Sequence, residues 1–138
     1  RKIRRDSQPV ETASEAPSQL TQWPVQLRLA PARASYFEGA HLLIAADCAA
    51  YAHGDFHQKF IRGHVVLIGC PKLDDADYAQ KLTEILQNND IRSILVARME
   101  VPCCGGLENA VRRALDASEK KIPLNVSVIS TDGRLIHE

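Results

Sequence analysis

The sequence has no excess charge of either sign and no long hydrophobic run. Its 17 Lys and Arg residues balance 17 Asp and Glu residues, whereas nucleic-acid-binding domains usually carry a clear basic excess. No stretch approaches the roughly 20 apolar residues of a membrane span, and no secretory signal pattern is present. These absences argue against nucleic acid and membranes as partners.

Cysteine is also scarce. The chain of 138 residues has four, at positions 48, 70, 103 and 104, too few for a small disulfide scaffold. The CxxC knuckles of structural zinc sites and the closely spaced cysteines of bacterial ferredoxins are both absent. A nucleotide or flavin site is the least supported, because there is no GxGxxG motif or P-loop. The positions of the four cysteines, described below, instead favour metal or redox chemistry, which we expect to take place in a reducing cytoplasm.

The chain begins with Arg rather than Met, so we expect it to be a fragment, a processed product or a domain of something longer. Residues 1–20 are polar, contain Pro9 and Pro17, and show no apolar period, which predicts a flexible linker. The remaining residues, 21–138, are predicted to form one α/β domain that contains all the cysteines.

Short apolar runs alternate with helical patterns along this domain. Continuous runs at 41–47, 64–70, 91–99 and 124–130 are typical of strands buried on both faces, and alternation at 25–30 suits an edge strand. Helices are predicted at 48–61, weakened by Gly54, at 74–90 with Asp74 as N-cap, and at 105–121. Trp23 and Met99 are predicted core residues. The expected fold is a three-layer, mostly parallel α/β sheet of the Rossmann/flavodoxin-like type.

This topology brings the cysteines together. Cys48 follows the first buried run, Cys70 the second, and Cys103 and Cys104 the third. Strand-to-helix junctions of a parallel sheet lie along one edge, where ligands bind in α/β folds. We therefore predict one site built from all four thiols.

Four soft sulfur donors select zinc, copper(I) or an iron–sulfur cluster. A cluster suits ligands drawn from three separate loops, so we expect an iron–sulfur cluster, of the 4Fe–4S type, in an electron-transfer domain rather than a stand-alone enzyme. Gly105 and Gly106 open the next helix and are predicted to present backbone N–H groups to it. Two alternatives remain. One is a metal-free thiol/disulfide domain in which Cys104 has a lowered pKa, and the other is a zinc-binding interaction module.

Three further residues are weaker candidates. Asp47 is predicted to cap a helix, with an oxygen ligand as the alternative. His53 and His57 are four residues apart and would share one helix face, although packing or surface roles are favoured.

Four segments carry a family resemblance: "SQLTQWPVQL", "LIAADCAAYAHGDFH", "LIGCPKLDDADYAQKLTEIL" and "RMEVPCCGGLENAV". They resemble the C-terminal domain of ferredoxin-type iron–sulfur proteins of anaerobic bacteria. Those proteins carry two 4Fe–4S motifs near the N-terminus, then a linker, then this domain. The resemblance implies electron transfer in the cytoplasm of an anaerobe, with the ferredoxin-type domain of the same full-length chain or another redox protein as partner.

A looser likeness is to the cysteine-rich CCG domains of heterodisulfide reductases. Cys70, 32 intervening residues and then Cys103-Cys104-Gly105 match the front half of that pattern. The downstream CxxC is absent, so the cluster type of that family does not transfer, and Cys48 is the candidate for the missing thiolate.

Overall fold

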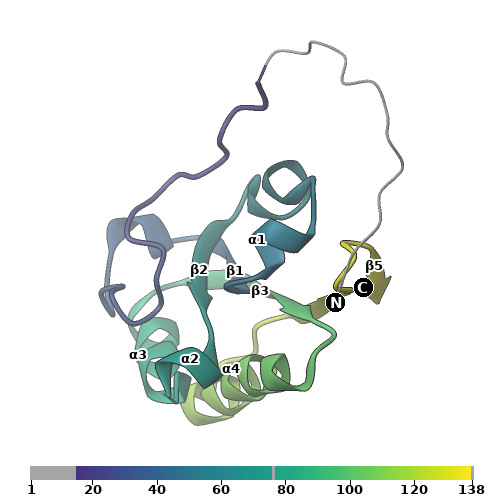
Figure 1. The fold of residues 1–138 in the computed structure, drawn as a ribbon. Coiled ribbons are helices and arrows are strands. Elements are labelled where there is room, and N and C mark those ends of the chain that lie inside the picture. The colour runs from purple at the N-terminus through teal and green to yellow at the C-terminus, as the bar shows by residue number, and fades with distance from the viewer. Residues whose placement is uncertain (1–14, 76, 138) are drawn as a thin grey trace, which may run out of the picture.

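A five-stranded sheet forms the centre of the structure, a computed structural model that describes residues 15–75 and 77–137. The strands are β1 (Ala40–Ala46), β2 (Val65–Gly69), β3 (Ile91–Met99), β4 (Leu124–Ile129) and β5 (Leu135–His137). Their order in the sheet is β2-β1-β3-β4-β5 (Figure 1). The first four strands pair in parallel and β5 is antiparallel to β4, so the predicted mostly parallel sheet is confirmed.

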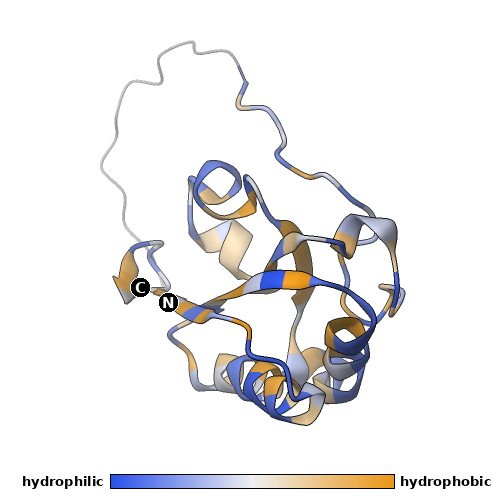
Figure 2. Ribbon diagram, turned by 180° about the vertical axis from the view of Figure 1, so that it is seen from behind, coloured by the Kyte–Doolittle hydropathy of each residue, from blue (hydrophilic) through white to orange (hydrophobic). Residues whose placement is uncertain are grey.

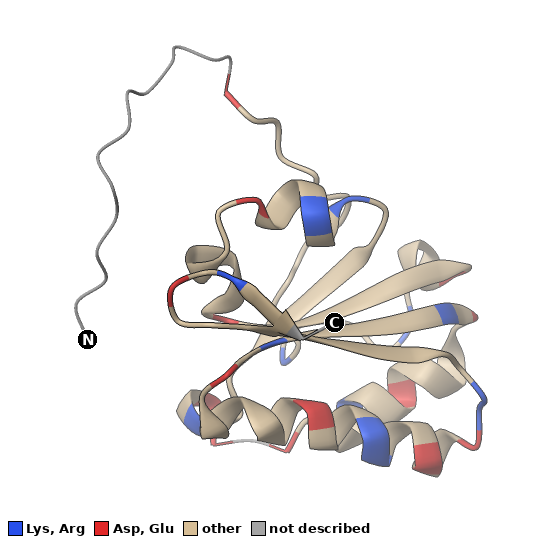
Figure 3. Cartoon of the chain, turned by 90° about the vertical axis from the view of Figure 1, so that its right-hand side faces the viewer, with Lys and Arg blue, Asp and Glu red and all other residues tan. Residues whose placement is uncertain are grey.

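Helices cover both faces of this sheet. On one face lie α1 (Ala49–Ala52) and the π-helix η2 (His57–Ile61). On the other lie α2 (Pro71–Asp74), α3 (Ala79–Asn88) and α4 (Gly105–Ser118), as Figures 1 and 3 show. Two 3-10 helices, η1 (Ser35–Phe37) and η3 (Pro102–Cys104), complete the helical elements of the described residues. The arrangement is the predicted three-layer α/β fold.

The hydrophobic runs of the sequence become the middle layer. Ile44, Leu67 and Val96 are fully buried on three neighbouring strands, and Met99 is buried as predicted. Helices α3 and α4 each contribute one apolar side, including Leu82 of α3. Figure 2 shows the resulting contrast between hydrophobic strands and helices of mixed hydropathy, and Figure 3 shows charged residues gathered mainly on helices and loops. Burial of these apolar faces is the main force that holds the layers together.

The segment before β1 protects the sheet edge formed by β2. The Gln22 side chain donates to the Val66 carbonyl oxygen at 2.6 Å and accepts from the Val66 N–H at 3.3 Å. Further along, Gln26 forms an isolated parallel bridge with Ile68. The predicted strand at 25–30 is therefore wrong, because only this bridge forms before the chain turns. The prediction that Trp23 lies in the core is also wrong, since its side chain is 74% exposed.

Other predictions needed correction at their boundaries. The helix predicted at 48–61 is two pieces, because α1 ends at Ala52 and η2 begins at His57. Asp74 is not the N-cap of α3. Tyr78 occupies that position, and Asp77 before it accepts the Ala79 N–H at 3.0 Å. Strand β5 was not predicted. Most of the predicted linker, residues 1–14, lies outside the described residues.

Within the part of the chain that the structure describes, no helix has both the length and the apolar character needed to cross a membrane.

Candidate functional site

The four cysteines meet at the carboxyl edge of three neighbouring strands. Cys48 lies between β1 and α1, and Cys70 between β2 and α2. Cys103 and Cys104 belong to η3, which follows β3. Because β1 lies between β2 and β3 and all three are parallel, their carboxyl ends open onto the same edge.

All four cysteines line one cavity of about 180 Å³, here called the thiol cavity. Its other lining residues are Ala46, Asp47, Gly69, Met99, Val101 and Thr131. None of the cysteines forms a disulfide. Within residues 15–75 and 77–137, no three His, Cys, Asp or Glu side chains are close enough together to hold a single metal ion. The thiols thus share a cavity without the tight grouping that a single-ion site has.

The vicinal cysteines differ in environment. Cys103 is exposed, whereas Cys104 is buried with 7% of its surface accessible. Burial raises the pKa of the Cys104 thiol. A backbone hydrogen bond from Met99 opposes that rise, and the neighbouring Cys103 and Cys70 add to it. The metal-free thiol/disulfide alternative required a lowered pKa for Cys104, and that part of it is wrong, because burial is the largest influence on this thiol.

Gly105 and Gly106 are the first two residues of α4. The Gly105 N–H donates to the Pro102 carbonyl oxygen, and a Cβ on Gly106 would lie 3.5 Å from the Pro71 side chain. That distance is an ordinary van der Waals contact, so the packing of α4 beside Pro71 does not require a glycine at position 106. Neither glycine is among the residues that line the thiol cavity. Their role as donors to a bound cluster stays a prediction.

A buried tyrosine supports the segment that carries Cys70. The Tyr78 hydroxyl donates to Asp74, and the Asp74 N–H donates to the Cys70 carbonyl oxygen at 2.9 Å. Burial raises the pKa of Tyr78 strongly, and the hydrogen bond to Asp74 raises it further. Tyr78 remains a neutral donor and ties Asp74 to the end of β2.

Asp47 lies beside the thiol cavity but does not cap α1. The N-cap is Cys48, and no side chain caps that helix. The Oδ1 atom of Asp47 is buried, and no hydrogen-bond donor among the described residues reaches it. Burial raises the pKa of this carboxyl, and Asp74 raises it further. Buried carboxyl oxygens are normally paired, so this one needs an explanation.

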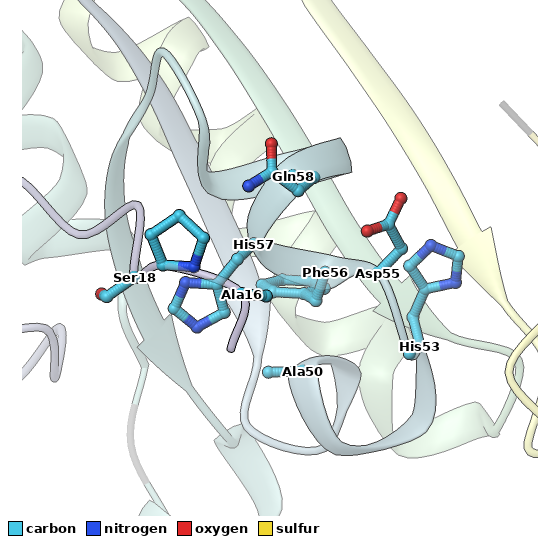
Figure 4. Close-up of a pocket in the computed structure, with 10 residues that line it drawn as sticks. Ala16, Ser18, Ala50, His53, Asp55, Phe56, His57 and Gln58 are labelled. Carbon is cyan, nitrogen blue, oxygen red and sulfur yellow. The ribbon is translucent and has the colours of Figure 1, made fainter. Parts of the chain in front are cut away.

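The two histidines do not share a helix face, because the chain unwinds between them. His53 Nδ1 lies 2.8 Å from the Gly133 carbonyl oxygen, in the turn before β5. His57 Nδ1 accepts the Gln19 N–H at 3.1 Å. Both rings line a cavity of about 260 Å³, where Figure 4 draws them well apart with Phe56 between them. They are not positioned as a metal-binding pair.

Sequence reasoning missed two residues of this region. Thr131 lines the thiol cavity from the segment after β4, and the strand-end rule used for the cysteines also applies to it. Tyr78 was seen only as part of an apolar helix face. Its hydrogen bond to Asp74, four residues earlier, depends on the backbone bend between α2 and α3, where Asp75 has a φ of 47°.

Comparison with known proteins agrees with this architecture. A family model described as a Rossmann-like domain matches residues 34–138. A relative from Archaeoglobus fulgidus is 31% identical over 116 residues, which cover 83% of this chain and 81% of that protein. It is described only as an uncharacterized protein. No solved structure matches the chain. The parallel sheet, its strand order and the family match together establish that the chain belongs to the Rossmann-like domain family.

Proposed function

We propose that this domain binds an iron–sulfur cluster through Cys48, Cys70, Cys103 and Cys104 and transfers electrons. The observation that carries the proposal is that every cysteine of the chain lines the same cavity, although they come from three separate loops. Cysteines that only fill a core are buried, whereas Cys48 and Cys103 of this cavity are exposed, so core packing does not explain why all four collect here.

The donor set fits a cluster better than a single ion. Thiolates suit zinc, copper(I) and iron–sulfur clusters. One zinc ion needs its sulfur donors within about 2.3 Å, and no three of the described donors are grouped tightly enough for one ion. A 4Fe–4S cluster spreads its ligands over several irons, so each thiol binds a different atom. The thiols come from three separate loops around one cavity, which supports that type.

The remaining lining residues are mostly apolar. Ala46, Met99 and Val101 surround the thiols, and Cys104 closes the buried side. A cluster held here would supply one-electron oxidation and reduction. The chain itself would shield the site from water on the inner side through Met99 and Cys104. The exposed Cys48 and Cys103 leave the outer side open, where an electron-transfer partner could approach.

The resemblance to the C-terminal domains of ferredoxin-type proteins supports the same function. It implies that electrons come from, or pass to, a ferredoxin-type domain of the same full-length chain or another redox protein. A cytoplasmic location in an anaerobe belongs to this proposal.

Metal content tests the proposal directly. The full chain is reconstituted anaerobically with iron and sulfide, and both are measured together with electron paramagnetic resonance of the reduced protein. About four irons and four sulfides per chain are expected for a 4Fe–4S cluster. Colourless protein without iron contradicts the proposal, and zinc without a redox signal favours the interaction-module alternative.

Variants then identify the ligands. Replacing each cysteine in turn by serine should remove most of the iron or convert the cluster to another type. The matched control is Gln87→Ser, which introduces the same residue at an exposed position of α3. Unchanged iron content in all four cysteine variants would refute the ligand assignment.

A further inference from the structure

We infer that His41 and His64 together bind one divalent ion of the late first-row transition metals, such as Ni²⁺ or Zn²⁺. His41 is the second residue of β1, and His64 directly precedes β2. Leu42 pairs with Val65 in parallel, so the two histidines before them stand side by side at the amino edge of the sheet. At about 3.3 Å per residue, His41 lies roughly 16 Å from Ala46, where β1 reaches the thiol cavity. The ion would therefore occupy a site separate from the cysteines.

The two imidazole rings are close enough to share an ion. Their centroids lie 6.3 Å apart, with an angle of 65° between the ring planes. A metal–nitrogen bond of about 2.1 Å, plus roughly 1.1 Å from ring atom to centroid, allows at most about 6.4 Å between two rings on one ion. A bent arrangement at the metal brings the centroids to about 5 Å. His41 is exposed, so rotation about its side-chain bonds covers that difference.

Contacts at Nδ1 leave the other ring nitrogen of each histidine for the metal. His64 Nδ1 lies 3.1 Å from the Arg62 carbonyl oxygen, which only accepts, so Nδ1 carries the proton and Nε2 has the lone pair. His41 Nδ1 lies 2.6 Å from Ser93 Oγ, which accepts in the same way. Within residues 15–75 and 77–137, neither Nε2 atom has a hydrogen-bond partner. Metal-binding histidines usually donate their second ring N–H to an oxygen in this manner.

An irregularity in strand pairing places the hydroxyl beside His41. The register between β1 and β3 shifts after Ala40, so that His41 pairs with Ser93 and Arg92 is the extra residue. Without this shift Arg92 would stand directly opposite His41, where its charge would oppose a cation. The Arg92 side chain packs over Gly39 instead, since a Cβ on that glycine would lie 3.6 Å from Arg92 Nε. The shift thus gives the histidine a neutral neighbour that orients its ring.

The donor set determines the class of ion. Imidazole nitrogen suits nickel, copper and zinc, whereas Mg²⁺ and Ca²⁺ require oxygen ligands. Among the described residues no third His, Cys, Asp or Glu joins the pair, so water completes the coordination. Two protein ligands are half the set of a structural zinc site. We therefore expect a Kd on the order of 1–100 µM.

Paramagnetic Ni²⁺ shows where the ion binds. It is titrated anaerobically into the ¹⁵N-labelled full chain, and the backbone amide signals are followed. Signals of Leu42, Val65 and their neighbours should broaden in a saturable manner, while Mg²⁺ should leave them unchanged. Because the thiol cavity lies at the other end of β1, any Ni²⁺ bound there broadens a different set of signals around Ala46. Broadening confined to that second set would overturn the inference.

Diamagnetic Zn²⁺ tests the ligand atoms on the unmodified chain. The ¹⁵N signals of Nε2 in His41 and His64 should shift together as Zn²⁺ is added, while both Nδ1 atoms remain protonated. A shift at only one of the two rings, or at neither, would contradict a shared ion. This measurement decides the question even if a variant fails to fold.

Variants then separate a shared ion from binding to single exposed histidines. His41→Asn and His64→Asn should each weaken Ni²⁺ binding at this edge at least about tenfold, because one of two ligands is lost. His57→Asn is the control and should change nothing here, since His57 lies in another cavity. Full affinity in either His41→Asn or His64→Asn would overturn the inference.

Ser93 is a positioning residue in this site. Ser93→Ala should weaken Ni²⁺ binding about tenfold, whereas Ser93→Thr keeps the hydroxyl and should retain most of the affinity. Equal affinities for these two variants would contradict the role given to the hydroxyl. Iron and sulfide content are measured separately, so the proposed cluster and the histidine site can fail independently.

Discussion

A Cβ atom placed on Gly69 would lie only 2.8 Å from the ring of Tyr78. Real Cβ contacts are essentially never that short, so the end of β2 packs on this ring only because residue 69 has no side chain. Cys70 is the next residue in the chain. The Gly69–Tyr78 contact therefore helps to fix the position of one of the four cysteines.

Gly69→Ala should destabilise the protein by about 1–3 kcal/mol, because the buried ring or the strand end must shift. Thermal unfolding measures the change. The control is Gly54→Ala, since no atom lies within 4 Å of a Cβ at that position. The control should be neutral or slightly stabilising. Equal unfolding temperatures for the two variants would show that Tyr78 gives way without cost.

The thiols should differ in reactivity in the metal-free protein. Burial raises the pKa of Cys104 above the ordinary value of about 8.5, so less thiolate is present at neutral pH. We expect iodoacetamide to modify Cys104 at least about tenfold more slowly than the exposed Cys103 at pH 7. Mass spectrometry of timed samples measures both rates. The rate at Cys104 should keep rising above about pH 8.5.

Unfolding in urea is the control for this comparison, because it should bring the two rates close together. Faster modification of Cys104 than of Cys103 in the folded chain would contradict the burial argument and favour the metal-free thiol/disulfide alternative.

The ion pair between Asp77 and Arg113 should make stability depend on pH. Both carboxylate oxygens of Asp77 accept from Arg113, at 2.9 and 2.8 Å, and join the start of α3 to α4. The hydrogen bonds from Arg113 lower the pKa of Asp77 below its unfolded value. The stabilisation is therefore complete above about pH 4 and is lost as the pH falls through the folded pKa.

Asp77→Asn should accordingly lower the unfolding temperature at pH 7 by a few degrees, and the difference from the unmodified chain should shrink below about pH 4. Unfolding curves at several pH values measure this, with the exposed Asp90→Asn as control. A difference that stays constant down to pH 2 would mean that the charge of Asp77 contributes nothing.

Gln22 should protect the edge of the sheet. Gln22→Ala leaves the Val66 N–H and carbonyl groups without their partners, at a cost of about 1–3 kcal/mol. Hydrogen exchange of the Val66 amide should become faster, while Gln87→Ala on the exposed side of α3 should leave it unchanged. Unaltered exchange at Val66 would show that another group covers this edge.

The sheet was predictable because its residues are hydrophobic on both faces. The run at 91–99 coincides with β3, and the runs around Ile44, Leu67 and Val126 differ from β1, β2 and β4 by at most one residue at each end. The convergence of the cysteines followed from parallel pairing alone. Strands that are buried on both faces of a parallel sheet are rich in hydrophobic residues, so they can be recognised in the sequence.

What could not be predicted depends on tertiary contacts. Val25 and its neighbours alternate like a strand, yet the partner edge gives them only one bridge, at Gln26. Asp74 looked like a cap, but its carboxylate accepts from the Tyr78 hydroxyl, and the Ala79 N–H at the start of α3 donates to Asp77 instead. The pKa of Cys104 follows from burial, which the position of a helix end does not reveal. The sequence pattern of one segment does not show which partner a side chain or backbone group will find in the folded chain.

The order of β2, β1 and β3 in the sheet has a consequence for how the chain tolerates change. Hydrogen-bonded neighbours keep a spacing of about 4.8 Å, so the separation of the three loops that bear the sulfur atoms is set by ladder pairing and not by the segments between them. Lengthening the connection after α3 would leave the sulfur arrangement intact. Inserting a single residue inside β1 would shift Cys48 relative to both β2 and β3 and would disrupt the arrangement of the sulfur atoms.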